Sequence, residues 1–144
     1  MAEFQRCLAN NETPIVYRRD GASVWEHGLW VKGLYAALSL LPSRSVEIHA
    51  MASHIGRWVL DGFKQYGGRW YIPYVIRRDK TYSTTPSKQL SLWCLPVIEL
   101  LDVFERSNLS TAEGKKITTI LDEFRTDPPI NGGYGDQTKW RLMR

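Results

Sequence analysis

The pattern of apolar and polar positions divides the chain into four helical stretches with short extended stretches around them. The first helical stretch, residues 27–41, reads HGLWVKGLYAALSLL and is apolar on nearly every side. A helix of this kind normally lies at the centre of its domain. Ser23, followed three residues later by Glu26, predicts a capping box at its start, and Pro42 ends it.

The second helical stretch begins at about residue 45 and has the spacing of an amphipathic helix. Its apolar side chains recur in steps of three and four residues. We expect Gly67 and Gly68 to end it, because glycine adopts the left-handed conformation found after many helices. The link between the first two helices is short, so an antiparallel helical hairpin is predicted. The apolar positions of the second helix are Ala52, Ile55, Val59, Phe63 and Tyr66.

The middle of the chain is predicted to be extended before a third helix begins. Residues 69–78 are rich in β-forming side chains, and Pro73 among them favours an edge strand. Pro86 is predicted to be the first residue of the third helix, which reaches about Arg106. Pro96 lies inside this stretch and predicts either a kink or the true beginning of the helix.

The fourth helix is predicted to open at a second capping box, formed by Ser110 and Glu113. Beyond it, apolar side chains such as Ile117 and Leu121 share one face. These four helices predict an all-α fold, or nearly so. Two helical hairpins would pack as a small bundle, with short extended or hairpin segments between them. The length suits one domain over residues 1–144.

One short phrase occurs twice in the chain. Residues 14–20 read PIVYRRD and residues 73–79 read PYVIRRD, so five of seven positions agree. Each copy leads toward a helix that contains Leu-Trp, and a Gly-Gly pair follows the second helix of each copy. Repeated units bury their faces against one another, so this order predicts an internal duplication, with units at 14–68 and 73–135.

The stretch QYGGRW, from Gln65 to Trp70, resembles the QW motif of the triterpene cyclases. The folds of that family are α/α toroids built of helical hairpins. The resemblance covers residues 56–104 and implies that Gln65 bonds to a neighbouring helix end while Trp70 stacks on it. The acidic Asp-x-Asp-Asp motif of the cyclases is absent from this chain. The resemblance therefore implies a hairpin architecture and not cyclase chemistry.

Composition and charge leave several kinds of partner open. The formal net charge of +4 permits contact with nucleic acid, anionic lipid or acidic ligands without requiring any of them. The two cysteines, Cys7 and Cys94, form no CxxC pair, which favours a reducing compartment. No apolar run reaches membrane length and no signal segment is recognised. We expect a soluble cytoplasmic protein with no membrane partner.

Arginines beside aromatic side chains form the strongest candidate for a binding site. Arginine holds phosphate or carboxylate through two parallel hydrogen bonds, and tyrosine and tryptophan add flat apolar surface. The alternative is structural, because each arginine of the repeated phrase could pair with Asp20 or Asp79. The predicted ligand-binding residues are Arg18, Arg77, Arg78, Trp30, Tyr74 and Trp93.

Other polar residues give no catalytic constellation. His49 and His54 are five positions apart, whereas metal-binding pairs on helices are three or four apart, so no metal is predicted. Glu26 and His27 are read as helix-start residues rather than as an acid/base pair. Carboxylates such as Glu105 are expected to be scattered over helix surfaces. We assign no catalytic residue and no cofactor.

The preferred function is a non-enzymatic binding or adaptor protein with an aromatic, arginine-lined cleft. Its partner would be an anionic or aromatic ligand, or another protein. The first alternative is an enzyme on a toroid-like hairpin scaffold that acts on a glycan or lipid. The second, less favoured, is a nucleic-acid-binding protein. A homo-oligomer is also expected, because two hairpins cannot close a ring alone.

Overall fold

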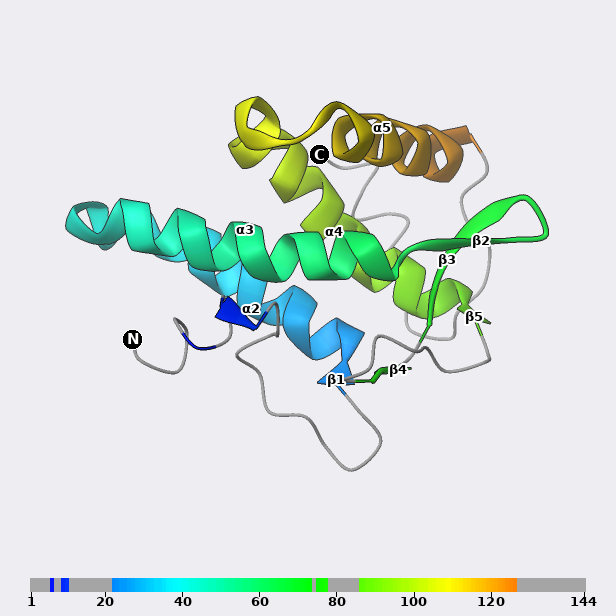
Figure 1. The fold of residues 1–144 in the computed structure, drawn as a ribbon, viewed down its shortest axis with the longest axis horizontal. Coiled ribbons are helices and arrows are strands. Elements are labelled where there is room, and N and C mark those ends of the chain that lie inside the picture. The colour runs from blue at the N-terminus through cyan, green and yellow to red at the C-terminus, as the bar shows by residue number, and fades with distance from the viewer. Residues whose placement is uncertain (1–5, 7–8, 11–21, 74, 78–85, 127–144) are drawn as a thin grey trace.

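A computed structural model describes residues 6, 9–10, 22–73, 75–77 and 86–126. This part of the chain is mostly helical, as predicted (Figure 1). The four long helices are α2 (Val24–Ala37), α3 (Ser45–Gly62), α4 (Lys88–Glu105) and α5 (Thr111–Thr126). Two short 3-10 helices join helices that are consecutive in the chain: η1 (Pro42–Arg44) lies between α2 and α3, and η2 (Arg106–Asn108) lies between α4 and α5.

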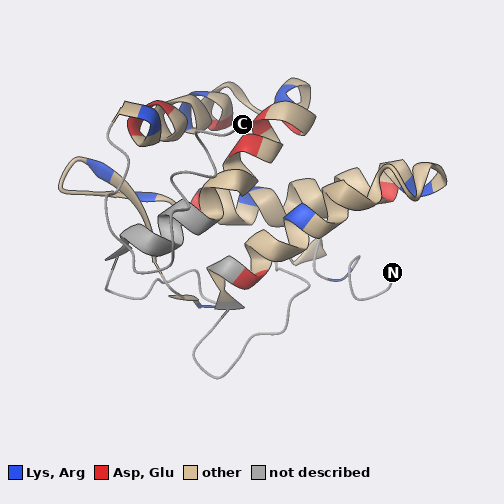
Figure 2. Cartoon of the chain, turned by 180° about the vertical axis from the view of Figure 1, so that it is seen from behind, with Lys and Arg blue, Asp and Glu red and all other residues tan. Residues whose placement is uncertain are grey.

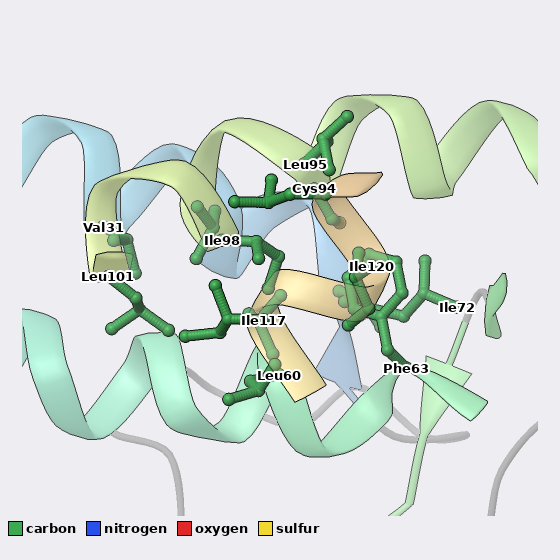
Figure 3. Packing of buried hydrophobic residues seen from close by; sticks show 14 of the residues in the cluster. Val31, Leu60, Phe63, Ile72, Cys94, Leu95, Ile98, Leu101, Ile117 and Ile120 are labelled. Atoms are coloured by element: carbon green, nitrogen blue, oxygen red, sulfur yellow. The ribbon is translucent and has the colours of Figure 1, made fainter. Parts of the chain in front are cut away.

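The core forms around α4, which contacts α2, α3, α5 and strand β3 (Arg69–Pro73). Leu95, Ile98 and Leu101 of this helix are fully buried and point into the cluster shown in Figure 3. Burial of each such side chain contributes about 1.5–3 kcal/mol. Gly56 of α3 permits the close approach of α4, because an added Cβ would lie 2.7 Å from a Leu101 methyl carbon. Cys94 is also buried, and burial raises the pKa of its thiol to about 12.

Helix α2 was predicted to lie at the centre of the domain, and this prediction is wrong. It packs one side against α3 and α4, where Val31 and Tyr35 are buried. The opposite side leaves Leu29 and Trp30 exposed. The physical reason is that α4 already occupies the centre, so α2 can bury only one of its apolar faces.

Two small antiparallel sheets accompany the helices. One contains β2 (Lys64–Tyr66), β3 and β5 (Pro86–Ser87) in the order β2-β3-β5. The other pairs β1 (Ala22–Ser23) with β4 (Val75–Ile76). Strand β3 is therefore central in its sheet, although Pro73 had favoured an edge strand. Pro73 sits at its last position, paired with Pro86 of β5.

The second helix ends earlier than predicted. It stops at Gly62, and residues 64–66 form strand β2. Gly67 and Gly68 have φ angles of 59° and 78° and connect β2 to β3. Two successive positive φ angles match the tight turns that join hairpin strands. The helical spacing of Phe63 and Tyr66 misled the prediction, because strand pairing with β3 competes successfully with one further helical turn.

The structure confirms one of the two predicted capping boxes, and it starts the third helix later than predicted. The backbone N–H of Ser110 donates to the Glu113 carboxylate at 2.8 Å, and the Glu113 N–H donates to the Ser110 hydroxyl at 3.2 Å, which confirms the second capping box. Ser23 is the N-cap of α2 but makes no side-chain cap hydrogen bond. The predicted capping box of Ser23 and Glu26 is therefore wrong. Helix α4 begins after Pro86, at Lys88, and continues through Pro96.

Candidate functional site

Neighbouring large apolar side chains are exposed on the outer side of α2, which we call the α2 face. It contains Leu29, Trp30, Gly33 and Leu34. Leu29 is 54% exposed and Trp30 is 58% exposed, which is high for large apolar side chains on a helix that also supports the core. These four residues line a shallow apolar groove of about 370 Å³.

The groove has the geometry of a helix-packing surface. Leu29 with Gly33, and Trp30 with Leu34, form two neighbouring rows of residues four apart along the helix. Such rows are the ridges between which a second helix places its own side chains. Gly33 lowers one row at its end because it has no side chain, and the space there is open, since an added Cβ would meet no atom within 4 Å. The α2 face therefore contains a notch bordered by large apolar side chains.

Further exposed apolar side chains lie in the turn after α2. Leu40 is 80% exposed in the turn that follows α2, and Leu41 is also exposed. Lys32 is the only Asp, Glu, Lys or Arg among residues 28–41, and it is exposed. Exposed apolar side chains thus occur on α2 from Leu29 onward and in the turn that follows it, and Lys32 is the charged residue among them.

A polar cluster behind the α2 face holds the end of α2 in place. The carboxyl group of Glu105 is buried, with 2% of the residue exposed, and it accepts a hydrogen bond from the Tyr35 hydroxyl at 3.0 Å. The same Glu105 oxygen lies 2.7 Å from Nδ1 of His49, at the start of α3. Burial, followed by the nearby Glu105, raises the pKa of Tyr35 far above its ordinary value. Phe104 stacks on the Tyr35 ring with centroids 4.6 Å apart.

This cluster corrects the expectation that Glu105 lies on a helix surface. The signal was present in the sequence, because Glu105 follows Ile98 by seven residues and Leu101 by four, and both are buried. Those spacings place it on the buried side of α4. His49 is the member of the cluster that reaches solvent, with 38% of its side chain exposed. Because Glu105 engages Nδ1, Nε2 is the nitrogen directed away from the cluster.

His27 forms a second buried polar group at the start of α2. Its Nδ1 lies 2.6 Å from the Ser23 carbonyl oxygen, so Nδ1 carries the proton and donates it. The ring stacks on Trp58 of α3, with centroids 4.2 Å apart. Burial lowers the pKa of His27 to about 4, although the Ser23 carbonyl acts in the opposite direction. His27 is therefore neutral near pH 7 and serves as a packing residue, in line with its reading as a helix-start residue.

A larger and more polar groove lies between α2 and α4. Its volume is about 640 Å³. Because Tyr35 and Phe104 form part of its wall, this groove lies directly beside the polar cluster. Charged groups of both signs also line it, so it favours neither an anion nor a cation. The lining includes Lys32, Tyr35, Glu99, Asp102, Phe104 and Arg125.

The six residues predicted to bind a ligand are only partly described. Arg18, Tyr74 and Arg78 lie outside the described residues, and the side chain of Trp93 does too, although its backbone belongs to α4. Arg77 follows β4 and is exposed, and Trp30 is exposed on the α2 face.

The pairing of β1 with β4 places the chain just after the first Arg-Arg-Asp beside the chain just before the second. The register aligns Ala22 with Ile76 and Ser23 with Val75. An aromatic, arginine-lined cleft at this place stays a prediction.

The described residues contain neither a cluster of metal-binding side chains nor a helix that could span a membrane. Within them, no three His, Cys, Asp or Glu side chains come together in a way that could hold a metal ion. None of the helices in these ranges has the length and apolar character needed to cross a membrane.

Comparisons of the chain with known protein families, with curated proteins and with solved structures found no match. The resemblance to the QW motif is therefore still a prediction. Gln65 and Trp70 are cross-strand partners in the β2–β3 hairpin. The proposal of a function rests on the geometry of the chain itself.

Proposed function

We propose that this chain is a non-enzymatic binding protein whose α2 face receives an amphipathic helix of a partner protein. The observation that carries the proposal is the exposure of Leu29 and Trp30 on a helix whose other side is packed into the core. Exposed, contiguous apolar surface on a folded domain commonly marks an interaction site. The proposal keeps the predicted binding function and assigns it to a surface of described side chains.

The geometry of the face supports a helix as its occupant. The two rows of residues four apart run along α2 and accept side chains spaced at three and four positions. We propose that one large aliphatic side chain of the partner occupies the notch at Gly33, where the space is open and Leu29, Trp30 and Leu34 line the groove. Such a contact buries an apolar anchor in a small pocket, as energetically dominant interface residues do.

The charge around the face supports an acidic flank on that partner helix. Lys32 borders the apolar rows and is exposed, and the whole chain carries a formal net charge of +4. Opposite charges at the rim of an interface raise the association rate and select the partner. We therefore infer a partner helix with aliphatic residues on one side and Asp or Glu next to them.

The scaffold that we propose for this face is the pair of helical hairpins expected from the sequence. The order helix, 3-10 helix, helix occurs twice among the described residues, in α2–η1–α3 and in α4–η2–α5. This repetition supports the duplicated units at 14–68 and 73–135. An enzyme acting on a glycan or lipid remains the alternative predicted from the sequence. A homo-oligomer is tested by the experiment below.

A binding titration with a defined probe tests the proposal. The probe is a fluorescently labelled synthetic helix with leucine at steps of three and four on one side and glutamate on the other. We expect saturable binding to the full chain in fluorescence anisotropy. Trp30→Glu places a charge in the contact and Gly33→Leu fills the notch, so each should weaken binding at least about tenfold.

Val46→Glu is the matched control, because Val46 is 82% exposed and lies on α3, outside the α2 face. It should leave the affinity unchanged. Equal binding by the wild-type chain and both α2 variants would overturn the proposal. A dimer in light scattering that Trp30→Glu converts to monomer would show that a second copy occupies the face, and would overturn the proposed partner helix.

A further inference from the structure

The outer part of the β2–β3 hairpin carries a regular alternation of cations and aromatic rings. Lys64 lies directly opposite Tyr71 in the antiparallel register, and Tyr66 lies directly opposite Arg69. Directly opposite residues in such a ladder project from the same face of the sheet. The four side chains therefore form a small square, which we call the hairpin square, with cations at two diagonal corners.

The two tyrosines occupy the other diagonal of the hairpin square. The ring centroids of Tyr66 and Tyr71 are 6.3 Å apart and their planes are tilted by 53°. Neither ring is buried, Lys64 is partly exposed, and Arg69 is exposed. A flat ligand can thus reach aromatic surface that has a cation on each side.

The opposite face of the hairpin anchors it to the body of the protein. Ile72 is fully buried and Trp70 packs against the core. The backbone N–H of Trp70 donates to the Glu123 carboxylate of α5 at 2.9 Å. Phe63, just before β2, is also fully buried. The hairpin square is therefore presented from a fixed support rather than from a free loop.

A further cation lies near the hairpin, in the company of the carboxyl groups of Asp61 and Glu123. Lys116 of α5 lies over the Trp70 ring, with its Nζ 5.4 Å from the ring centroid. Burial, followed by repulsion from Lys64, lowers the pKa of Lys116 to about 8, although Asp61 acts in the opposite direction. Figure 2 shows lysine and arginine on both the hairpin and α5, which lie close together in the two views. Like charges held close together favour an anionic ligand that neutralises them.

We propose that the hairpin square binds single-stranded nucleic acid, with a base on the tyrosines and the two flanking phosphates at Lys64 and Arg69. Successive bases and phosphates alternate along a single strand, as aromatic rings and cations alternate on the hairpin square. Aromatic stacking combined with cationic contacts is the usual means of binding single strands without sequence preference. The hairpin projects from the body away from the turn between α2 and α3 (Figure 1), so this binding goes beyond the function proposed for the α2 face.

Fluorescence anisotropy with labelled oligothymidylate of increasing length tests the inference on the full chain. We expect the affinity to rise with length, to fall with salt, and to exceed that for thymidine monophosphate by at least about tenfold. Tyr71→Ala and Tyr66→Ala should each weaken binding about tenfold, whereas Tyr71→Phe should keep it. The double variant with Lys64→Ala and Arg69→Ala should lower the slope of log affinity against log salt by about 1.4.

Lys115→Ala is the matched charge control, because Lys115 is exposed on α5 and outside the hairpin square. Because it removes one charge rather than two, it should change the salt slope by less than half as much as the double variant does. Poly-aspartate is the control polymer and should bind more weakly than oligothymidylate. Equal affinity for both polymers, or tyrosine variants that bind like wild type, would show general anion attraction and overturn the inference.

A measurement on the wild-type chain keeps the test decisive if a hairpin variant fails to fold. Backbone amide resonances of residues 64–71 should shift on addition of oligothymidylate, while those of α2 should not. Shifts confined to α2, or an absence of shifts in the hairpin at saturating probe, would also overturn the inference.

Discussion

The hydroxyl of Tyr35 donates a hydrogen bond of 3.0 Å to the carboxyl group of Glu105, seventy positions further along the chain. The contact joins the end of α2 to the end of α4. His49 adds the start of α3 to the same carboxyl group. Three helix ends therefore depend on one buried acid, and the α2 face is held in position from behind by this acid.

Removal of the Tyr35 hydroxyl tests how much this contact stabilises the fold. Tyr35→Phe keeps the ring that stacks on Phe104 but leaves Glu105 with one hydrogen bond fewer. We expect the free energy of unfolding to fall by about 1–2 kcal/mol in urea denaturation. Ser39→Ala removes an exposed hydroxyl that bonds only its own turn, and should change stability by less than about 0.5 kcal/mol. Equal effects of the two substitutions would contradict the role assigned to Glu105.

The buried His27 predicts a loss of stability in mild acid. Its pKa is about 4 in the folded chain against 6.5 for an ordinary histidine, so the unfolded chain binds more protons between these values. Stability therefore rises with pH through this window and is lost as the pH falls toward 4. The full difference corresponds to about 3 kcal/mol.

Denaturation of wild type and His27→Phe at pH 7, 6, 5 and 4 measures this effect. Phenylalanine keeps a ring against Trp58 but cannot be protonated. The variant should lose less stability than wild type between pH 7 and 4, because residue 27 then binds no proton and only the other titratable groups contribute. Parallel pH profiles for the two proteins would show that His27 does not become protonated on unfolding.

The two serines at helix starts predict opposite results from the same substitution. Ser110→Ala removes the hydroxyl that accepts the Glu113 N–H, and should destabilise the chain by about 1 kcal/mol. The Ser23 hydroxyl is buried and has no hydrogen-bond partner among the described residues. Ser23→Ala should therefore be neutral or slightly stabilising. Thermal melts of both variants test this prediction. A decrease in stability for Ser23→Ala as large as that for Ser110→Ala would contradict the assignment of a capping hydrogen bond to Ser110 and none to Ser23.

Features that depend on near neighbours in the chain could be predicted. The capping box of Ser110 and Glu113 joins residues three apart, and the apolar spacing of α5 repeats within a few turns. Such signals involve residues a few positions apart, whose separation in space follows directly from helix geometry. The helical class of the fold followed from them, although the end of α3 did not, because β3 pairing competes with helix there.

The candidate surfaces depend on which elements meet, and sequence reasoning found only part of them. Trp30 was predicted as a binding residue on other grounds and lies on the α2 face, but its neighbour Leu29 was not singled out. Tyr66 and Tyr71 were counted with a helix end and an extended segment, so their shared face was missed. The register that joins them arises from the Gly67-Gly68 turn.

The amino-acid sequence by itself determined that the described part of the chain is mostly helical and where α5 begins, because hydrogen bonds and side-chain spacing within one helix are local. Only the tertiary structure decided that α4 rather than α2 occupies the centre, and that Glu105 is buried between three helix ends. These outcomes depend on competition for a limited core, in which one apolar helix excludes another. The apolar face left exposed on α2 is the consequence of that competition.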